Sequence, residues 1–223
     1  MPQIDETPAD YVDEKGHKYT TVVTKATTSK NGKTESKCSV CGAVKSGSTK
    51  TVYYPKTIKL EYTSTTYNGK TKTPSVSVKD YKGKTVSSSN YTVSYPKSRK
   101  SVGKYSVTIT FKGNYSGTLT AYFTIVPKES KVEKLTAAKK SLKVKLDKVS
   151  SQASGYEIQY STSSKFSSKY TKTKKVTSYK TTSVTLKSLK AKKTYYVRVR
   201  TYKTVDGKKY YSDWSSKKSK KTK

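Results

Sequence analysis

The sequence predicts an all-β protein built of small antiparallel domains that follow one another as independent units. Residues favoured in strands, namely Tyr, Val, Ile and Thr, occur in short runs that alternate between apolar and polar side chains. Gly, Asn and Ser separate these runs, as turns do. Only 31% of the 223 residues are hydrophobic, so the cores have to be thin and partly built of the 21 tyrosines. Alternation with period two gives each sheet one buried face, as a sandwich of two sheets requires.

The chain carries a net charge of +34, from 48 basic and 14 acidic residues. All but three of the basic residues are lysines, and the exceptions are Arg99, Arg198 and Arg200. Lysine is a hydrated point charge, whereas arginine offers the planar fork that reads guanine edges. The composition therefore predicts diffuse attraction to polyanions and no specific nucleic-acid recognition. High charge and low hydrophobicity alone are typical of disorder, but the regular alternation favours folded domains.

Residues 1–16 contain five of the 14 acidic residues and little hydrophobic pattern, which predicts a flexible acidic leader. The start of the chain lacks the apolar centre of a signal peptide, which suggests an internal fragment or a mature form. No apolar run approaches the roughly 20 residues that a membrane-spanning helix needs. We therefore expect no membrane span.

Residues 17–50 form a small β module of their own. Strand-like runs at 17–26 and 34–37 flank Asn31-Gly32, and a Cys38-x-x-Cys41-Gly42 knuckle follows. Asn-Gly predicts a hairpin with a type I′ turn, because both positions of that turn take positive φ. The knuckle brings two thiolates within reach of one metal ion.

The chain has one histidine, His17, and no cysteines besides Cys38 and Cys41. Together these residues offer three ligands to a structural zinc ion, and a carboxylate such as Glu14 or Glu35 would have to supply the fourth. A disulfide between Cys38 and Cys41 is an equally good interpretation, and two unligated thiols are a third. The sequence leaves all three open. It predicts a structural role for this site and no cofactor other than this possible zinc.

The same residues resemble a short repeat in surface proteins of Gram-positive gut bacteria. In that repeat a His precedes a Lys-Ala-Thr segment, a Gly turn and Cys-x-x-Cys-Gly, in the order found here. Many copies carry a further cysteine where this chain has Thr28 or Ser29. The difference weighs against zinc.

Residues 51–126 are predicted to form the second unit, with strands at 58–62, 75–78, 91–95, 104–111 and 118–125. Asn68-Gly69 and Lys82-Gly83 predict hairpins, and the Gly-Asn-Tyr-Ser-Gly sequence at 113–117 joins the two longest strands. Over nearly its whole length this segment resembles an immunoglobulin-like repeat of secreted Firmicutes proteins. The resemblance implies a spacer or adhesive module of the cell surface.

Residues 127–217 are predicted to form the third unit, since Pro127 ends the preceding strand. Apolar residues alternate in four runs: Leu142, Val144 and Leu146; Tyr156, Ile158 and Tyr160; Val184 and Leu186; Tyr195, Val197 and Val199. These runs, with 211–215 as the last strand, resemble a fibronectin type III domain. The fold class is thus a tandem of immunoglobulin-like and fibronectin type III β-sandwiches behind an N-terminal hairpin and knuckle module.

The resemblance also implies roles for single residues. Tyr195 occupies the corner position, where the hydroxyl anchors the preceding loop. The tryptophan that the family carries on its second strand is missing, and Trp214 is expected to fill part of that volume. Asp206-Gly207 stands where some members carry an integrin-binding Arg-Gly-Asp loop, and it predicts an ordinary turn. The lysines of residues 218–223 repel one another, which predicts an extended basic tail.

No catalytic constellation accompanies His17: the sequence has no nucleophile elbow, no phosphate-cradling Gly loop and no adjacent carboxylate pair. We therefore expect no enzyme. The resemblances imply an extracellular or cell-surface location in a Gram-positive bacterium. The expected role is a noncatalytic module that spaces or presents neighbouring domains and binds weakly to anionic cell-wall polymers or host glycans. A dedicated adhesin for one glycan or host protein is the first alternative, and non-specific nucleic-acid binding is the second.

Overall fold

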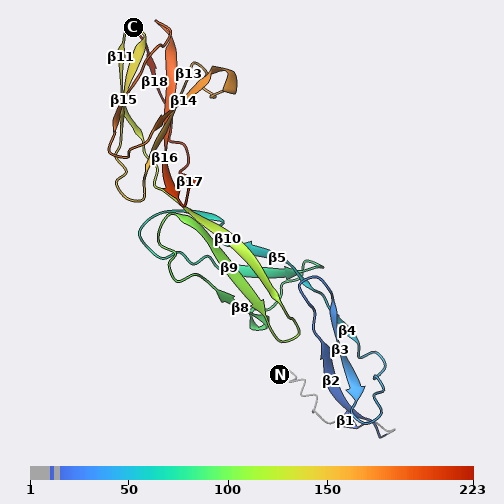
Figure 1. The fold of residues 1–223 in the computed structure, drawn as a ribbon. Coiled ribbons are helices and arrows are strands. Elements are labelled where there is room, and N and C mark those ends of the chain that lie inside the picture. Colours follow the sequence, from blue (N-terminus) through green and yellow to red (C-terminus); the bar gives the residue numbers. More distant parts are fainter. Residues whose placement is uncertain (1–10, 13–15) are drawn as a thin grey trace, which may run out of the picture. The chain divides into compact units, whose positions relative to one another are not determined.

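The computed structural model describes residues 11–12 and 16–223 and confirms the all-β prediction (Figure 1). Apart from two short 3-10 turns, η1 (Ser88–Asn90) and η2 (Ser168–Tyr170), the regular elements of this part are strands. Within it, no helix has the length and apolar character of a membrane span. The predicted acidic leader, with Glu14, lies almost wholly outside the described residues.

Contacts along the chain define two compact units. The first comprises Met1–Glu61, Thr73–Pro96 and Ser106–Tyr122, and the second comprises Tyr62–Lys72, Lys97–Tyr105 and Phe123–Lys223. The predicted central domain therefore contributes strands to both units. The boundaries at residues 50, 126 and 217 stay predictions.

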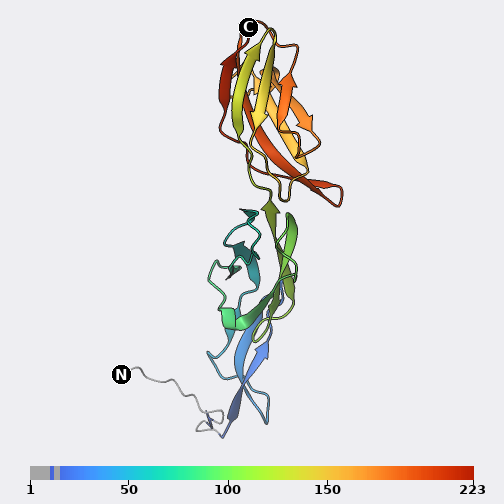
Figure 2. The ribbon, with the colours of Figure 1, turned by 90° about the vertical axis from the view of Figure 1, so that its left-hand side faces the viewer.

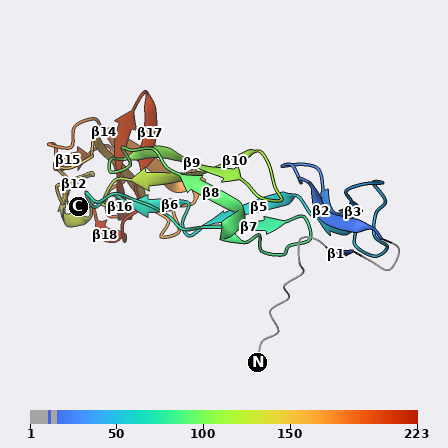
Figure 3. The same cartoon turned by 90° about the horizontal axis from the view of Figure 1, so that it is seen from below.

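The N-terminal part of the first unit is one antiparallel sheet in the order β1-β2-β3-β4, and Figure 3 labels the first three of these strands. Its strands are β1 (Tyr11–Val12), β2 (Lys18–Thr24), β3 (Gly32–Cys38) and β4 (Lys50–Val52). The predicted pair of strands is present as β2 and β3, with Tyr19 opposite Cys38.

The turn predicted at Asn31-Gly32 is wrong. The chain reverses earlier, where Thr27 N donates to Lys30 O at 2.9 Å and Lys30 N donates to Thr27 Oγ1 at 3.0 Å. Gly32 is the first residue of β3 and does not take positive φ. A Cβ at Gly32 would lie 2.1 Å from the carbonyl oxygen of Thr24, so close approach of two backbones, rather than a left-handed turn, requires glycine here.

The loop before β3 contacts another part of the first unit. Ala26 is fully buried, its N–H donates to Asn114 O at 2.9 Å, and its carbonyl accepts from Ser116 N at 2.8 Å. These bonds fix the N-terminal sheet to the predicted 113–117 loop. The 17–50 module, which the sequence predicts to be independent, is therefore hydrogen-bonded to the central segment within this unit.

The central strands confirm all five predicted for this segment and add a sixth. Strands β5 (Pro55–Leu60) and β7 (Val76–Asp80) pair antiparallel, and a four-stranded sheet has the order β6-β10-β9-β8. Its members are β6 (Ser64–Thr66), β8 (Tyr91–Ser94), β9 (Gly103–Phe111) and β10 (Thr118–Val126). The unpredicted strand, β6, pairs in parallel with the end of β10.

Of the two hairpins predicted for this segment, one is present as a short turn closed by an antiparallel bridge between Lys79 and Thr85. At Lys82-Gly83 the carboxylate of Asp80 accepts from Lys82 N and Lys84 N, both at 2.9 Å, and Gly83 has φ of 82°. Gly69 also takes positive φ, but the strands on either side pair elsewhere: β6 with β10 and β7 with β5. The prediction of a hairpin at Asn68-Gly69 is therefore wrong, because that turn links strands of two different sheets.

The C-terminal part of the second unit is a β-sandwich (Figure 2). One sheet is β11 (Val132–Ala138), β12 (Ser141–Leu146) and β15 (Ser183–Leu186). The other has the order β14-β13-β16-β17, and β18 also pairs with β16. Its strands are β13 (Gly155–Ser161), β14 (Thr171–Val176), β16 (Thr194–Val205), β17 (Lys208–Tyr211) and β18 (Lys218–Lys221).

Both sheets of the sandwich contribute to one core. The buried side chains include the predicted apolar faces: Leu142, Val144, Leu146, Tyr156, Ile158, Val184, Leu186, Tyr195, Val197 and Val199. Tyr195 Oη accepts from Lys190 N at 3.1 Å, as expected of a corner tyrosine. Asp206 and Gly207 have φ of 47° and 74°, which gives the predicted turn between β16 and β17.

Three expectations for this domain differ from the structure. The last strand, predicted at 211–215, is wrong: β17 ends at Tyr211, and the following strand, β18, begins at Lys218. Trp214 does not fill core volume; it is partly exposed and packs against Arg198 and Arg200 on the outer face of β16, while Tyr156 is the largest fully buried side chain. The basic tail is not an extended linker. It forms β18, whose backbone bonds to β16 outweigh the repulsion between lysines that point into solvent.

Candidate metal centre and cationic pocket

The Cys-x-x-Cys knuckle begins where β3 ends. Cys38 N donates to Ala43 O at 2.8 Å, Gly42 N donates to Cys38 O at 3.0 Å, and Gly42 has φ of 73°. The tight turn directs the backbone N–H groups of Cys41 and Val40 at the buried sulfur of Cys38. These two donors, Cys41 first, lower the pKa of the Cys38 thiol to about 6, against the opposing effect of desolvation.

The register of β2 and β3 places His17 beside this knuckle, because its neighbour Tyr19 pairs with Cys38. His17 Nδ1 lies 3.4 Å from Cys41 Sγ. The three predicted ligand atoms, from His17, Cys38 and Cys41, all lie within 4.8 Å of one another. The structure thus brings together all three predicted site residues.

One of these distances fits a tetrahedral zinc ion. Zn–S bonds of about 2.3 Å and Zn–N bonds of about 2.0 Å separate a sulfur and a nitrogen ligand by roughly 3.5 Å, close to the distance between His17 Nδ1 and Cys41 Sγ. No carboxylate of the described residues joins this group. Glu35 Oε2 instead accepts from Lys33 Nζ at 2.8 Å, so Glu35 is not placed as the fourth ligand. Cys38 and Cys41 are not joined by a disulfide in this structure.

A second cluster, which sequence reasoning did not find, lies on the outer face of β16. The guanidinium carbon of Arg198 lies 4.1 Å from the ring centroid of Phe166 and 4.7 Å from that of Trp214. The guanidinium carbon of Arg200 lies 4.4 Å from the same Trp214 centroid and 3.8 Å from that of Tyr211. The sequence signal for this cluster was the Arg-x-Arg spacing, which places both arginines on one face of a strand. Nothing in the sequence showed that the rings of Phe166 and Trp214 pack against that face.

The two arginines have different partners on β13. Arg200 Nε and Nη2 donate to Glu157 Oε2 at 3.0 and 2.6 Å, and Arg198 Nε and Nη2 donate to Gln159 Oε1 at 2.9 and 2.7 Å. Burial, and then the charge of Arg200, lower the pKa of Arg198. Arg200 therefore has a counter-charge, whereas Arg198 has a neutral partner.

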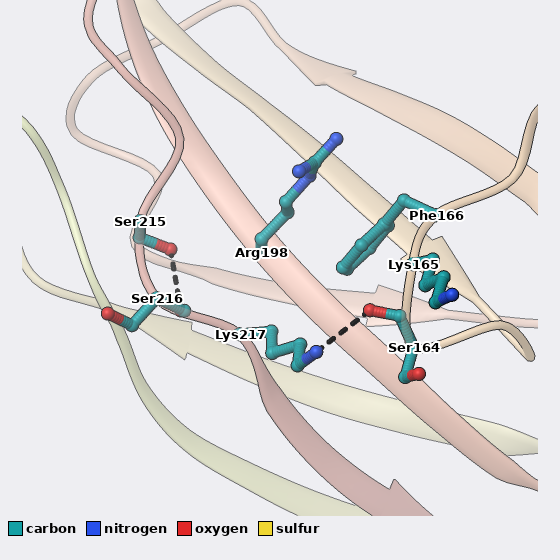
Figure 4. A pocket seen from close by; sticks show the side chains of 7 residues that line it. All are labelled: Ser164, Lys165, Phe166, Arg198, Ser215, Ser216 and Lys217. Atoms are coloured by element: carbon teal, nitrogen blue, oxygen red, sulfur yellow. Dashed lines mark hydrogen bonds between the residues drawn. The ribbon is translucent and has the colours of Figure 1, made fainter.

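A pocket of about 420 Å³ opens beside Arg198 (Figure 4). Its other cations are Lys165 and Lys217, and its remaining lining comes from Phe166 and three serines. Lys217 Nζ donates to Ser164 O at 2.9 Å. Among the described residues, no acidic side chain lines the pocket.

Comparison with known proteins gives a family match for the C-terminal sandwich. Residues 126–218 match the family model described as fibronectin type III domain. Among solved structures, the chain is similar to the FN1-FN3 domains of chicken CNTN1, with 14% identity, a TM-score of 0.39, and coverage of 86% of this chain and 77% of that one. It is also similar to domains A168-A170 of titin, with 13% identity, a TM-score of 0.36, and coverage of 94% and 86%.

A comparison with curated proteins found no match. The family match agrees with the two-sheet sandwich and its corner tyrosine. Such domains are typically noncatalytic modules that interact with neighbouring domains. The chain therefore contains a fibronectin type III domain over residues 126–218.

Proposed function

We propose that the chain is a noncatalytic extracellular module that spaces or presents neighbouring domains and attaches weakly to anionic envelope polymers or host glycans. The observation that carries the proposal is uncompensated charge on a β-sandwich scaffold. With 14 acidic and 48 basic residues, most lysines have no possible acidic partner. Diffuse positive charge attracts polyanions through a field that salt screens within about 10 Å.

The placement of the lysines supports diffuse attraction. Lys172, Lys174 and Lys175 are exposed on β14 of one sheet, and Lys143 and Lys145 are exposed on β12 of the other. Charge on both faces suits attachment to a surrounding polymer more than recognition of one partner by one face.

Binding measured at two salt concentrations tests this proposal. The probes are teichoic acid, an acidic mucin glycan, a neutral glycan and duplex DNA. We expect weak binding to every polyanion at low salt, no binding to the neutral glycan, and loss of the attraction near physiological salt. Salt-resistant binding to one ligand, abolished by replacing a small tyrosine cluster, would favour a dedicated adhesin instead. A strong preference for DNA over the other polyanions would favour nucleic-acid binding.

The proposed location is the outside of a Gram-positive bacterium. Fibronectin type III domains are common in extracellular proteins, and the N-terminal and central segments resemble surface repeats. The test is the complete reading frame that encodes this chain: an export signal upstream is expected, and its absence would contradict the location.

Zinc binding by His17, Cys38 and Cys41 is a second candidate function, because the three ligand atoms converge. Backbone N–H groups that point at Cys38 Sγ stabilise a thiolate, as zinc requires. Three protein ligands leave the fourth position to water or to a carboxylate. The expected effect of the ion is to hold the end of β3 against the start of β2.

Elemental analysis and thiol titration of the full chain, purified without chelator, separate the three states of this site. We expect one zinc ion per chain and thiols that react only after a chelator is added. His17→Ala and Cys41→Ser should each lower the zinc content, whereas Ser46→Ala, an exposed control in the same module, should not. Thiols that react only after a reductant would indicate the disulfide, and metal-free thiols that react at once would indicate no ligand.

A further inference from the structure

We infer that the pocket beside Arg198 binds the carboxylate of an acidic saccharide. The inference rests on the proposed attachment to glycans, and it names the chemical group recognised and the place of recognition. Its volume of about 420 Å³ falls within the range of small-molecule sites, roughly 300–1,000 Å³. Figure 4 shows Arg198, Lys217, Phe166 and Ser164 around the same space.

The first argument is the missing counter-charge. Arg198 and Arg200 leave the same face of β16, and the antiparallel register sets them opposite Gln159 and Glu157. The carboxylate of Glu157 neutralises Arg200. The amide of Gln159 fixes Arg198 in the same way but leaves its charge in place. A bound carboxylate would give Arg198 the counter-charge that Glu157 gives Arg200.

The second argument is that the donors are already positioned. Phe166 and Trp214 hold the guanidinium of Arg198 between them, and Gln159 takes the hydrogen bonds of Nε and Nη2. Among the described residues, none accepts from the remaining nitrogen, Nη1. The bond to Ser164 O likewise fixes the ammonium of Lys217, which keeps two further N–H groups. Because these side chains are ordered by the fold, binding loses little conformational entropy here.

The third argument is the backbone at Phe166, which has φ of 54°. A bulky side chain rarely adopts this left-handed conformation, and residues held in it are concentrated at functional sites. A short turn, in which Phe166 N donates to Ser163 O at 3.1 Å, keeps the ring in the pocket wall. The ring supplies an apolar edge for sugar C–H groups, and the hydroxyls of Ser164 and Ser216 can bond to sugar hydroxyls.

Titration of the full chain with two matched oligosaccharides tests the inference. The probes are a tetrasaccharide of hexuronic acid, the neutral hexose tetrasaccharide of the same linkage, and inorganic phosphate as a small anion. We expect the uronic acid probe to bind at least tenfold more tightly than either of the others. Arg198→Gln should weaken its binding at least tenfold, and thermal unfolding shows whether this variant is folded.

Two lysine variants complete the experiment. Lys165→Gln removes a pocket charge without disturbing the ring stack and should weaken binding about threefold. Lys143→Gln removes the same charge from β12 on the other sheet and should change binding less than twofold. Equal losses for the Lys165 and Lys143 variants would show diffuse attraction alone and overturn the pocket, while the proposed function would stand. Phosphate binding as tight as that of the uronic acid would overturn the saccharide assignment. Absence of binding to any polyanion at low salt would overturn both.

Discussion

Arg200 Nη2 lies 2.6 Å from Glu157 Oε2, across the paired strands β13 and β16. Glu157 is only 5% exposed although it lies on the outer face of its sheet, because Arg200 and the ring of Tyr211 cover it. Tyr211 Oη also donates to Glu157 Oε1 at 3.3 Å. The carboxylate is thus satisfied by three donors from two neighbouring strands.

Arg200→Gln is expected to destabilise the fibronectin type III domain by about 3 kcal/mol, since removing one partner leaves a buried carboxylate without its counter-charge. The double variant Glu157→Gln with Arg200→Gln should lose clearly less, because the two amides can bond to each other. Denaturant unfolding of both single variants and the double variant measures the coupling. Additive losses would show that the pair contributes nothing beyond its two side chains.

Tyr156→Phe is expected to cost about 2 kcal/mol, because it leaves a buried backbone donor unsatisfied. In the native domain Tyr156 Oη accepts from Val149 N at 2.9 Å and donates to Tyr179 O at 3.0 Å. Tyr195→Phe removes a single bond, from Lys190 N, and should cost about 1 kcal/mol. Denaturant unfolding gives both values. A larger loss for Tyr195 would mean that the corner bond outweighs the buried one.

The domain is expected to lose stability at alkaline pH. Burial raises the pKa values of Tyr156, Tyr202 and Tyr211, with the charge of Glu157 as a second cause for the last two. The unfolded chain therefore releases its phenolic protons first, near pH 10. The contribution of these groups to stability is complete below that pH and is lost as the pH rises through their folded-state pKa values.

Thermal unfolding from neutral pH to above about pH 10 measures this loss. Deprotonation of lysines acts in the opposite direction, since it reduces repulsion within the chain. The variant Tyr156→Phe separates the two effects: its midpoint should fall less steeply with pH than that of the unaltered chain. An identical slope would contradict the tyrosine explanation.

Local signals in the sequence predicted the strands of the C-terminal sandwich well. The alternation of Tyr195, Val197 and Val199 set which face of β16 is buried, and Asp206-Gly207 set the turn that follows. Strands β11, β14 and β18 were not predicted. In β14, lysines occupy three of the six positions, and the strand exists because its backbone pairs with β13 rather than because most of its side chains pack into a core.

The sequence predicted the candidate metal centre but not the cationic pocket. Cys38, Cys41 and His17 are the chain's only ligands of their kinds, so their convergence was predictable from rarity and from the knuckle spacing. The stack of Phe166, Arg198 and Trp214 joins segments far apart in the chain. Packing between segments far apart in the chain produces no periodic pattern in the sequence. The pairing of Arg198 with Gln159, rather than with an acidic residue, produces none either.

The last prediction concerns Gly32, where the backbone of β3 passes close to the end of β2. Gly32→Ala is expected to destabilise the N-terminal sheet by about 3 kcal/mol, because the new Cβ would overlap the carbonyl of Thr24 and the N–H of Ala26 and force the two segments apart. Ala26 N and O hold the 113–117 loop, so the disturbance should reach Asn114 and Ser116.

Hydrogen exchange of the full chain measures this loss of local stability at each backbone N–H group. Faster exchange is expected at Ala26 and Ser116 in Gly32→Ala, with no change in β13 and β16 of the fibronectin type III domain. Ser46→Ala, an exposed substitution in the same module, serves as the control. If exchange rose at Ala26 but not at Ser116, the hydrogen bonds between the N-terminal sheet and the 113–117 loop would not couple their stabilities, and the module would be as independent as its sequence suggests.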